Sequence, residues 1–262
     1  MTTLSLAVRD SSTMLRRNLL HMRRYPSMTL MLVGLPVIFL LLFVYVFGGT
    51  LGAGLGPAGG RAQYANYVAP GILLITVAGA AQGTAISVAM DMTEGIIARF
   101  RTMKIFRPSV LTAHVLGSVI QTLIGLTVVT GVALLVGFRP NANAIEWVAA
   151  IGVLLMISFA VIWFSVACGL VSKSVETASN LPMPLILLPF LSSGFVPTDS
   201  MPTALRWFAD LQPFTPFIET LRGLLLGTAI GDSAIWAVVW CAGIGVVSYL
   251  WARRLYNRNA AR

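Results

Sequence analysis

Six long apolar runs constrain the fold of this chain more than any other feature of its sequence. They occupy residues 28–47, 68–90, 109–138, 147–171, 181–196 and 233–252. A helix that crosses a bilayer needs about 20 mainly apolar residues, and hydrophobic residues make up 57% of the chain against 10% charged residues. The pattern therefore predicts an all-α integral membrane protein with six transmembrane helices.

The fifth run differs from the others because it is short and contains Pro182, Pro184 and Pro189. A proline inside a helix lacks the amide hydrogen and leaves a carbonyl oxygen without its helical partner. Within a bilayer, such a carbonyl must be satisfied by protein or by water. We therefore expect a kinked helix that is buried in protein rather than exposed to lipid.

Basic residues are distributed unevenly between the two sides that six crossings would create. Fourteen of the eighteen lysines and arginines lie on the side of the N-terminus, and only Arg61, Arg139, Arg206 and Arg222 lie on the other. Short loops rich in Lys and Arg remain in the cytoplasm, so both termini are expected there, in a multi-pass protein of the plasma (inner) membrane. Attraction to anionic lipid accounts for the net charge of +9 without nucleic-acid binding.

Two segments near the first run have predicted structures of their own. Residues 4–24 combine apolar and Arg-rich positions, which is typical of an amphipathic helix in the membrane interface. Residues 48–61 are rich in glycine and predict a flexible outer loop. With little chain left for a soluble domain, we expect one membrane domain. It would comprise an interfacial helix (1–27), a six-helix body (28–252) and a cytoplasmic tail (253–262).

The region before the last span, residues 197–232, is too polar to cross a membrane but contains helical patterns near residues 201–211 and 214–226. We expect a re-entrant helical hairpin in the outer leaflet. On it, Glu219 and Arg222 have the i, i+3 spacing of an exposed ion pair on one helix.

Residues 91–107, DMTEGIIARFRTMKIFR, form the most informative loop on the expected cytoplasmic side. Asp91 or Thr93 is placed to cap a short helix with Glu94 in its first turn. Apolar and basic residues then alternate, and Pro108 suits the first turn of the third apolar helix. Residue chemistry alone leaves two interpretations open: a turn that anchors the chain to the membrane, or a surface that binds another protein.

No ionisable side chain lies deep in any of the six runs, although Asp91 and His114 lie near their inner ends. Carriers coupled to protons or sodium generally need buried carboxylates or histidines, so the sequence argues against a secondary transporter. His114 and Gln121 are the nearest candidates for a proton relay, but a lone histidine here is expected to be a packed or solvated polar group. The two cysteines, Cys168 and Cys241, are expected to be buried free thiols.

Enzyme motifs are also missing from the sequence. It contains no G-x-S-x-G or H-E-x-x-H motif, and neither of its lysines, Lys104 and Lys173, follows a Walker A glycine run. We therefore expect no catalytic residue, no metal and no directly bound cofactor. Energy for transport against a gradient would have to come from a partner that contacts the cytoplasmic surface formed by residues 91–107 and the N-terminal helix.

Two local motifs, together with the expected topology, resemble the permease subunit of ABC type-2 exporters of the daunorubicin/doxorubicin-resistance branch. The first is Glu94-Gly95-Ile96-Ile97-Ala98-Arg99-Phe100-Arg101 followed by Pro108, Ser109 and Leu111. The second is Pro213-Phe214-Thr215-Pro216 followed by Glu219, Arg222 and Gly227. The family usually has a proline a few residues after the second arginine, whereas this chain has Ile105-Phe106-Arg107-Pro108.

The resemblance implies that residues 92–104 form a coupling helix that docks in a groove of a separate ATP-binding subunit. Glu94, Arg99 and Arg101 would make polar contacts there, with Ile97 and Phe100 as apolar anchors. Two permease chains, identical or different, would assemble with two ATPase chains that bind the ATP.

At the opposite side of the membrane, the resemblance implies an outer gate built from the hairpin with Pro213, Pro216, Glu219 and Arg222, and with Glu219 facing the outer vestibule. The expected function is export of hydrophobic or amphipathic compounds such as drugs and antibiotics. Export of a lipid or a glycan remains an alternative, as does a membrane scaffold or assembly factor without transport activity.

Overall fold

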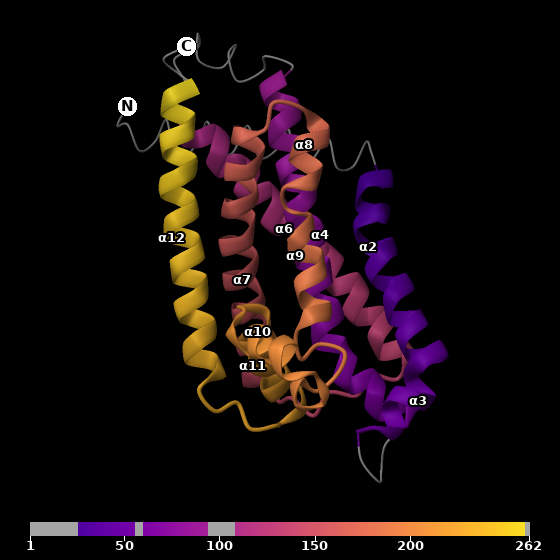
Figure 1. Ribbon diagram of the computed structural model, residues 1–262. Helices are drawn as coiled ribbons and strands as arrows, with labels where there is room; N and C mark the ends of the chain where they lie inside the picture. The colour runs from indigo at the N-terminus through magenta and orange to yellow at the C-terminus, as the bar shows by residue number, and fades with distance from the viewer. Residues whose placement is uncertain (1–25, 56–59, 94–107, 260–262) are drawn as a thin grey trace.

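The computed structural model describes residues 26–55, 60–93 and 108–259 of the 262-residue chain (Figure 1). The described residues are helical throughout, with short connections. The long helices are α2 (Pro26–Leu41), α4 (Arg61–Thr93), α6 (Pro108–Val136), α7 (Ala144–Val171) and α12 (Ser233–Asn259). As the sequence predicts, α6 begins at Pro108. The predicted interfacial helix, residues 4–24, lies outside the described residues.

Five helical segments in the described part of the chain are long and apolar enough to cross a membrane. They are Leu32–Ala53, Arg61–Thr93, His114–Val136, Ala144–Val171 and Ser233–Tyr256. They correspond to five of the six apolar runs and confirm a multi-pass helical membrane protein.

The fifth run does not form a comparable helix. Its residues fall into α9 (Met183–Leu187) and the 3-10 turn η2 (Leu188–Leu191), and the short helix α8 (Val175–Asn180) precedes it. Together these 17 residues would span about 26 Å at 1.5 Å per residue, less than the roughly 30 Å of a hydrocarbon core. The sixth crossing is thus not confirmed. The expected burial also fails within one chain, because the side chains of Met183 and Leu187 are 50% exposed.

The glycine-rich segment 48–61 is more regular than a flexible loop. A π-helical stretch η1 (Leu42–Phe47) continues α2 and leads into α3 (Gly48–Ala53), and α4 already begins at Arg61. A Cβ atom on Gly52 would lie 2.5 Å from the carbonyl oxygen of Gly60. Glycine is needed there because the two backbones meet in close packing, so the predicted loop was wrong for the described part of this segment.

Helix α4 is the centre of the bundle and packs against α2, α6, α7 and α8. Most of its side chains are buried over its whole length. A Cβ atom on Gly169 of α7 would lie 2.7 Å from the carbonyl oxygen of Ala85 on α4, so the two backbones are almost in contact, as small residues allow in membrane helices. Figure 1 shows α12 and α2 on opposite flanks of this core.

The two ends of the bundle carry different elements. α10 (Thr203–Leu211) and α11 (Phe214–Leu226) lie at the end where α3 is found, which is called the hairpin end below. α8 and the C-terminal end of α12 lie at the opposite end (Figure 1). The helical segments expected near residues 201–211 and 214–226 are therefore confirmed.

Candidate functional site

Helices α10 and α11 at the hairpin end are positioned by proline and glycine residues at their ends. Pro202 and Pro213 precede α10 and α11, where a missing amide hydrogen costs nothing to the helix. Gly227 ends α11 with φ of 73°, a left-handed conformation that glycine adopts without a steric penalty. Pro216 is buried within the first turns of α11.

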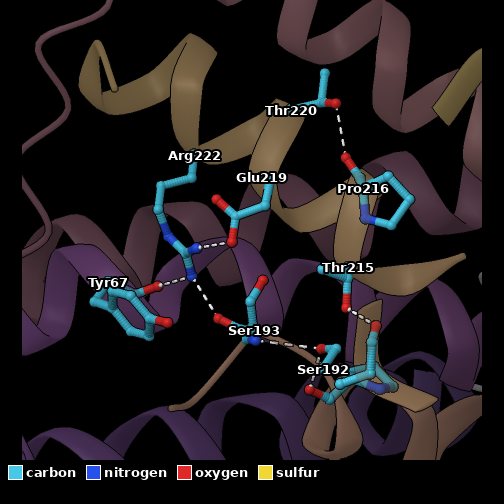
Figure 2. A network of polar contacts seen from close by, with 11 residues as sticks. Tyr67, Ser192, Ser193, Thr215, Pro216, Glu219, Thr220 and Arg222 are labelled. Atoms are coloured by element: carbon cyan, nitrogen blue, oxygen red, sulfur yellow. Dashed lines mark hydrogen bonds and ion pairs between the residues drawn. The ribbon is translucent and has the colours of Figure 1, made fainter. Parts of the chain in front are cut away.

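Arg222 is the most heavily bonded side chain at this end (Figure 2). Its Nη1 donates to Glu219 Oε1 at 2.7 Å, and its Nη2 donates to the carbonyl oxygens of Ser193 at 2.7 Å and Tyr67 at 3.2 Å. Its Cζ atom also lies 3.9 Å from the centre of the Tyr67 ring, within the range of a cation–π contact. Arg222 thus joins α11 to α4 and to the chain after η2.

The ion pair of Glu219 and Arg222 forms as its spacing predicts, but the expected exposure is wrong. Arg222 is only 6% exposed, and the Glu219 side chain is 32% exposed. Carbonyl oxygens from distant parts of the chain replace water around the guanidinium group. Removing one partner of a buried pair costs about 3–5 kcal/mol, far more than losing an exposed pair.

The chain turns back toward the hairpin between α9 and η3 (Thr198–Ser200). Residues 188–195, which are η2 and the four residues after it, are called the bend. Side chains satisfy several carbonyl oxygens of the bend. Gln212 Nε2 donates to those of Leu188 and Leu191, both at 3.1 Å, and the Tyr64 hydroxyl donates to that of Phe195 at 3.1 Å. Irregular backbone inside a membrane protein is tolerated where the protein itself satisfies it.

The bend also lies directly against α4. A Cβ atom on Gly71 of α4 would lie 3.0 Å from the carbonyl oxygen of Gly194 and 3.1 Å from its Cα atom. The two glycines therefore allow backbone to approach backbone. The bend is held on α4 both by this packing and by the bonds of Tyr64 and Arg222.

Four phenylalanine rings gather where the bend meets the first apolar helix. Phe43 lies 4.4 Å from Phe195, and Phe190 stacks on Phe195 at 4.6 Å, measured between ring centres. Phe39 makes an edge contact with Phe190 at 5.3 Å. These rings form an apolar, flat-sided cluster beside the π-helical stretch η1, and π-helical turns occur frequently at functional sites.

Near the opposite end of α4, Asp91 and His114 form a buried pair. His114 Nε2 lies 3.0 Å from Asp91 Oδ2, so the pair links α4 to α6. The expected cap at Asp91 is wrong, because Asp91 lies inside α4 and its carboxylate contacts His114. His114 is likewise not a lone histidine. The Thr93 hydroxyl donates back to the carbonyl oxygens of Ala89 and Met90.

The residues expected to couple the chain to an ATPase are Glu94, Gly95, Ile97, Arg99, Phe100 and Arg101, and all lie outside the described residues. The two cysteines are free and buried, as predicted. Within residues 26–55, 60–93 and 108–259, no group of three or more His, Cys, Asp or Glu side chains is placed to hold a metal ion.

Three features of the site were missed by the sequence interpretation. They are the contacts of Arg222 with Tyr67 and Ser193, the Asp91–His114 pair, and the phenylalanine cluster. Tyr67 precedes Arg222 by 155 residues, and Ser193 precedes it by 29. No short-range spacing identifies such partners. The phenylalanines were visible only as apolar residues within two separate runs.

Comparison with known proteins identifies the family. Residues 10–226 match the family described as ABC-2 type transporter, a match that ends at the last residue of α11. The chain is 31% identical to the daunorubicin resistance ABC transporter permease protein DrrB1 of Streptomyces coeruleorubidus over 261 residues, covering 97% of this chain and 88% of that protein.

A second relative is the probable doxorubicin resistance ABC transporter permease protein DrrC of Mycobacterium tuberculosis. It is 27% identical over 163 residues, covering 62% of this chain and 59% of the relative. The resemblance noted in the sequence is thereby confirmed: this chain belongs to the ABC-2 type transporter family.

Proposed function

We propose that this chain is the permease subunit of an ATP-driven exporter that moves hydrophobic or amphipathic compounds, including drugs and antibiotics, out of the cell. The observation that carries this proposal is its similarity to a daunorubicin resistance permease over 97% of the chain. The multi-pass helical body and the family support it. The chain lacks a Walker A motif, so the ATP would bind to a separate subunit.

The orientation follows from the charges of the loops. The cytoplasmic side would carry both termini and residues 91–107, and the hairpin end would face outward. Tyr67 and Asp91 are 24 positions apart on α4, which corresponds to about 36 Å of helix. The hairpin end and the Asp91–His114 pair therefore lie on opposite sides of the membrane in this proposal.

The substrate class fits the side chains near the hairpin end. In the cluster, Phe39, Phe43 and Phe190 are partly exposed and pack around the buried Phe195, and the rings carry no hydrogen-bonding group. Aromatic faces pack favourably against other flat rings. A polyaromatic amphipathic compound suits this surface, whereas a glycan would need hydrogen-bonding partners beside the rings.

A second permease chain would complete the membrane body. The interrupted fifth run exposes Leu181, Met183, Leu187 and Leu191 on a single chain, and its prolines leave backbone carbonyls without helical partners. Such irregular backbone does not face lipid directly. We propose that a second permease chain covers α9, and that residues 94–101 of each chain dock on one copy of the ATP-binding subunit.

Inverted membrane vesicles test the proposal, using the fluorescence of daunorubicin to follow uptake. Vesicles that contain this chain and its ATP-binding subunit should accumulate the drug only when ATP is supplied. A protonophore should not stop the uptake, and a partner disabled in its Walker A lysine should abolish it.

Other outcomes separate the alternatives. Uptake that needs a proton gradient and no ATP would contradict the proposal in favour of a secondary carrier. Transfer of a fluorescent phospholipid analogue without daunorubicin uptake would assign lipid export. A chain that inserts and binds the ATPase but moves none of these probes would be a scaffold.

A further inference from the structure

The contacts of Arg222 place it between the longest helix of the chain and the hairpin. α4 runs for 33 residues with Pro70 inside it, about 50 Å at 1.5 Å per residue. Its last residue, Thr93, adjoins the proposed ATPase-coupling segment, and Tyr67 near its first turns contacts Arg222. One helix thus connects the expected cytoplasmic end of α4 with the residue that contacts Arg222 of α11.

The contacts of Arg222, called the joint below, oppose the separation of α11 from α4. The guanidinium group is 6% exposed and contacts three elements: Glu219 on α11, Tyr67 on α4 and the Ser193 carbonyl oxygen on the bend. Parting α11 from α4 would remove partners from a buried charge, which is costly in a low-dielectric interior. Packing of Gly71 on Gly194 fixes the bend to the same stretch of α4.

The chain segments on either side of α11 are more exposed to solvent than Arg222 is. The link to α12 contains Gly227 and Gly231, both with positive φ, and residues 227–229 and 231–232 are exposed. On the other side, Arg206 of α10 pairs with Asp199 and Asp210, and its side chain is 48% exposed. α11 packs against α12 and α7 as well as α4, and its contact with α4 includes the buried charge of Arg222.

We propose that Arg222 is a positioning residue that transmits the movement of α4 to α11 and the bend. In this arrangement α4, α11 and the bend move as one unit, and the hairpin end opens only when α4 is displaced from the cytoplasmic side. The proposal rests on the function proposed above. It assigns to one buried arginine the step between ATP hydrolysis on the partner and opening at the far side of the membrane.

The test compares substrate moved per ATP hydrolysed in proteoliposomes that contain the permease and its ATPase. Arg222→Gln removes the charge and most of the bonds to α4. It should reduce the drug transported per ATP by at least about fivefold, the lower end of typical coupling between distant sites, while ATP hydrolysis continues. Arg206→Gln is the matched control in the same hairpin and should leave the ratio unchanged.

A merely structural role predicts a different result. If Arg222 only stabilised the local fold, Arg222→Gln would lower the amount of assembled complex, and the remaining complex would transport with the normal ratio. That outcome would overturn the proposal. Should Arg222→Gln fail to accumulate, Glu219→Gln and Arg222→Lys decide the matter. Each variant keeps some of the contacts of Arg222. Each should lower the amount of drug transported per ATP hydrolysed, but less than Arg222→Gln does.

A distance measurement separates this inference from the proposed function. Spin labels replace the exposed residues Gln63 at the start of α4 and Thr228 after α11. Their distance distribution should be unaffected by ATP in the parent complex, broaden in Arg222→Gln and stay narrow in Arg206→Gln. Absence of ATP-driven transport in the parent complex would refute the proposed function alone. An unchanged distance distribution in Arg222→Gln would refute the proposal that Arg222 holds α11 on α4.

Discussion

Gly169→Ala tests the close packing of α7 on α4 in the described core. The new Cβ atom would lie 2.8 Å from the Cβ atom of Val88 and 2.7 Å from the carbonyl oxygen of Ala85. Carbon atoms pack best at about 3.5–4.0 Å, so α4 and α7 would have to separate by roughly 0.7 Å. Neither contact is the end of a flexible side chain, so the strain cannot be relieved by rotation.

Overpacking of this kind costs about 1–3 kcal/mol, and the usual gain from replacing a helical glycine by alanine, about 0.5–1 kcal/mol, offsets part of it. For a chain of this size, 1 kcal/mol corresponds to roughly 2–4 °C in Tm. The net cost is therefore at most about 2.5 kcal/mol, and we expect Gly169→Ala to lower the Tm of the detergent-solubilised protein by up to about 10 °C.

Gly152 provides the matched control because it lies on the same helix, and a Cβ atom added to it would meet nothing within 4 Å. Gly152→Ala should leave the Tm unchanged or raise it. Thermal unfolding followed by loss of monodisperse protein in size-exclusion chromatography measures both variants. Equal Tm values for the two would refute the interpretation that backbone contact between α4 and α7 requires Gly169.

Three further substitutions have expected outcomes in the same thermal assay. Tyr64→Phe removes the hydroxyl that donates to the Phe195 carbonyl oxygen. Its free energy of unfolding should fall by about 1–3 kcal/mol, since that oxygen is left without its donor. An unchanged Tm would show that the bend is not held through this bond. His114→Leu removes a buried partner of Asp91 and should also lower the free energy of unfolding by about 1–3 kcal/mol. The double variant His114→Leu with Asp91→Leu should recover part of this loss. Asn143→Ala removes the side-chain cap of α7 and should cost about 1 kcal/mol, while Asn143→Asp should retain the parent Tm.

Much of the helical body is predictable because apolar runs of sufficient length have few alternatives in a membrane. Five runs, the start of α6 at Pro108 and the two helical segments of the hairpin are present as expected. Local signals suffice for these features. They depend on run length, on proline at a helix start and on helical periodicity.

Other features depend on contacts that no local pattern contains. The spacing of Glu219 and Arg222 predicts their ion pair, but the burial of Arg222 comes from Tyr67 and Ser193, which are distant in sequence. Gly52 was assigned to a loop because glycine is common in loops, whereas its role is close packing on Gly60. In both cases the tertiary partner decides what the residue does.

The fifth run illustrates a different difficulty. Its prolines correctly indicate an irregular helix, but they do not show where the helix breaks or what covers it. α8 and α9 are separated at Leu181–Pro182, and some apolar side chains around α9, such as Met183 and Leu187, are exposed on the single chain. In the proposed transporter a second permease chain buries this segment, and composition carries no signal of that assembly.

In the proposed transporter, this chain has no ATP site of its own and receives energy through residues 94–101. The most direct test measures ATP hydrolysis by the partner subunit in liposomes with and without this chain. The parent chain should stimulate hydrolysis, and Glu94→Ala combined with Arg99→Ala should abolish the stimulation without loss of membrane insertion. Lys173→Ala, which changes an exposed basic residue on the same expected side, should behave as the parent. Full stimulation by the double variant, or transport by the purified chain alone, would contradict the account.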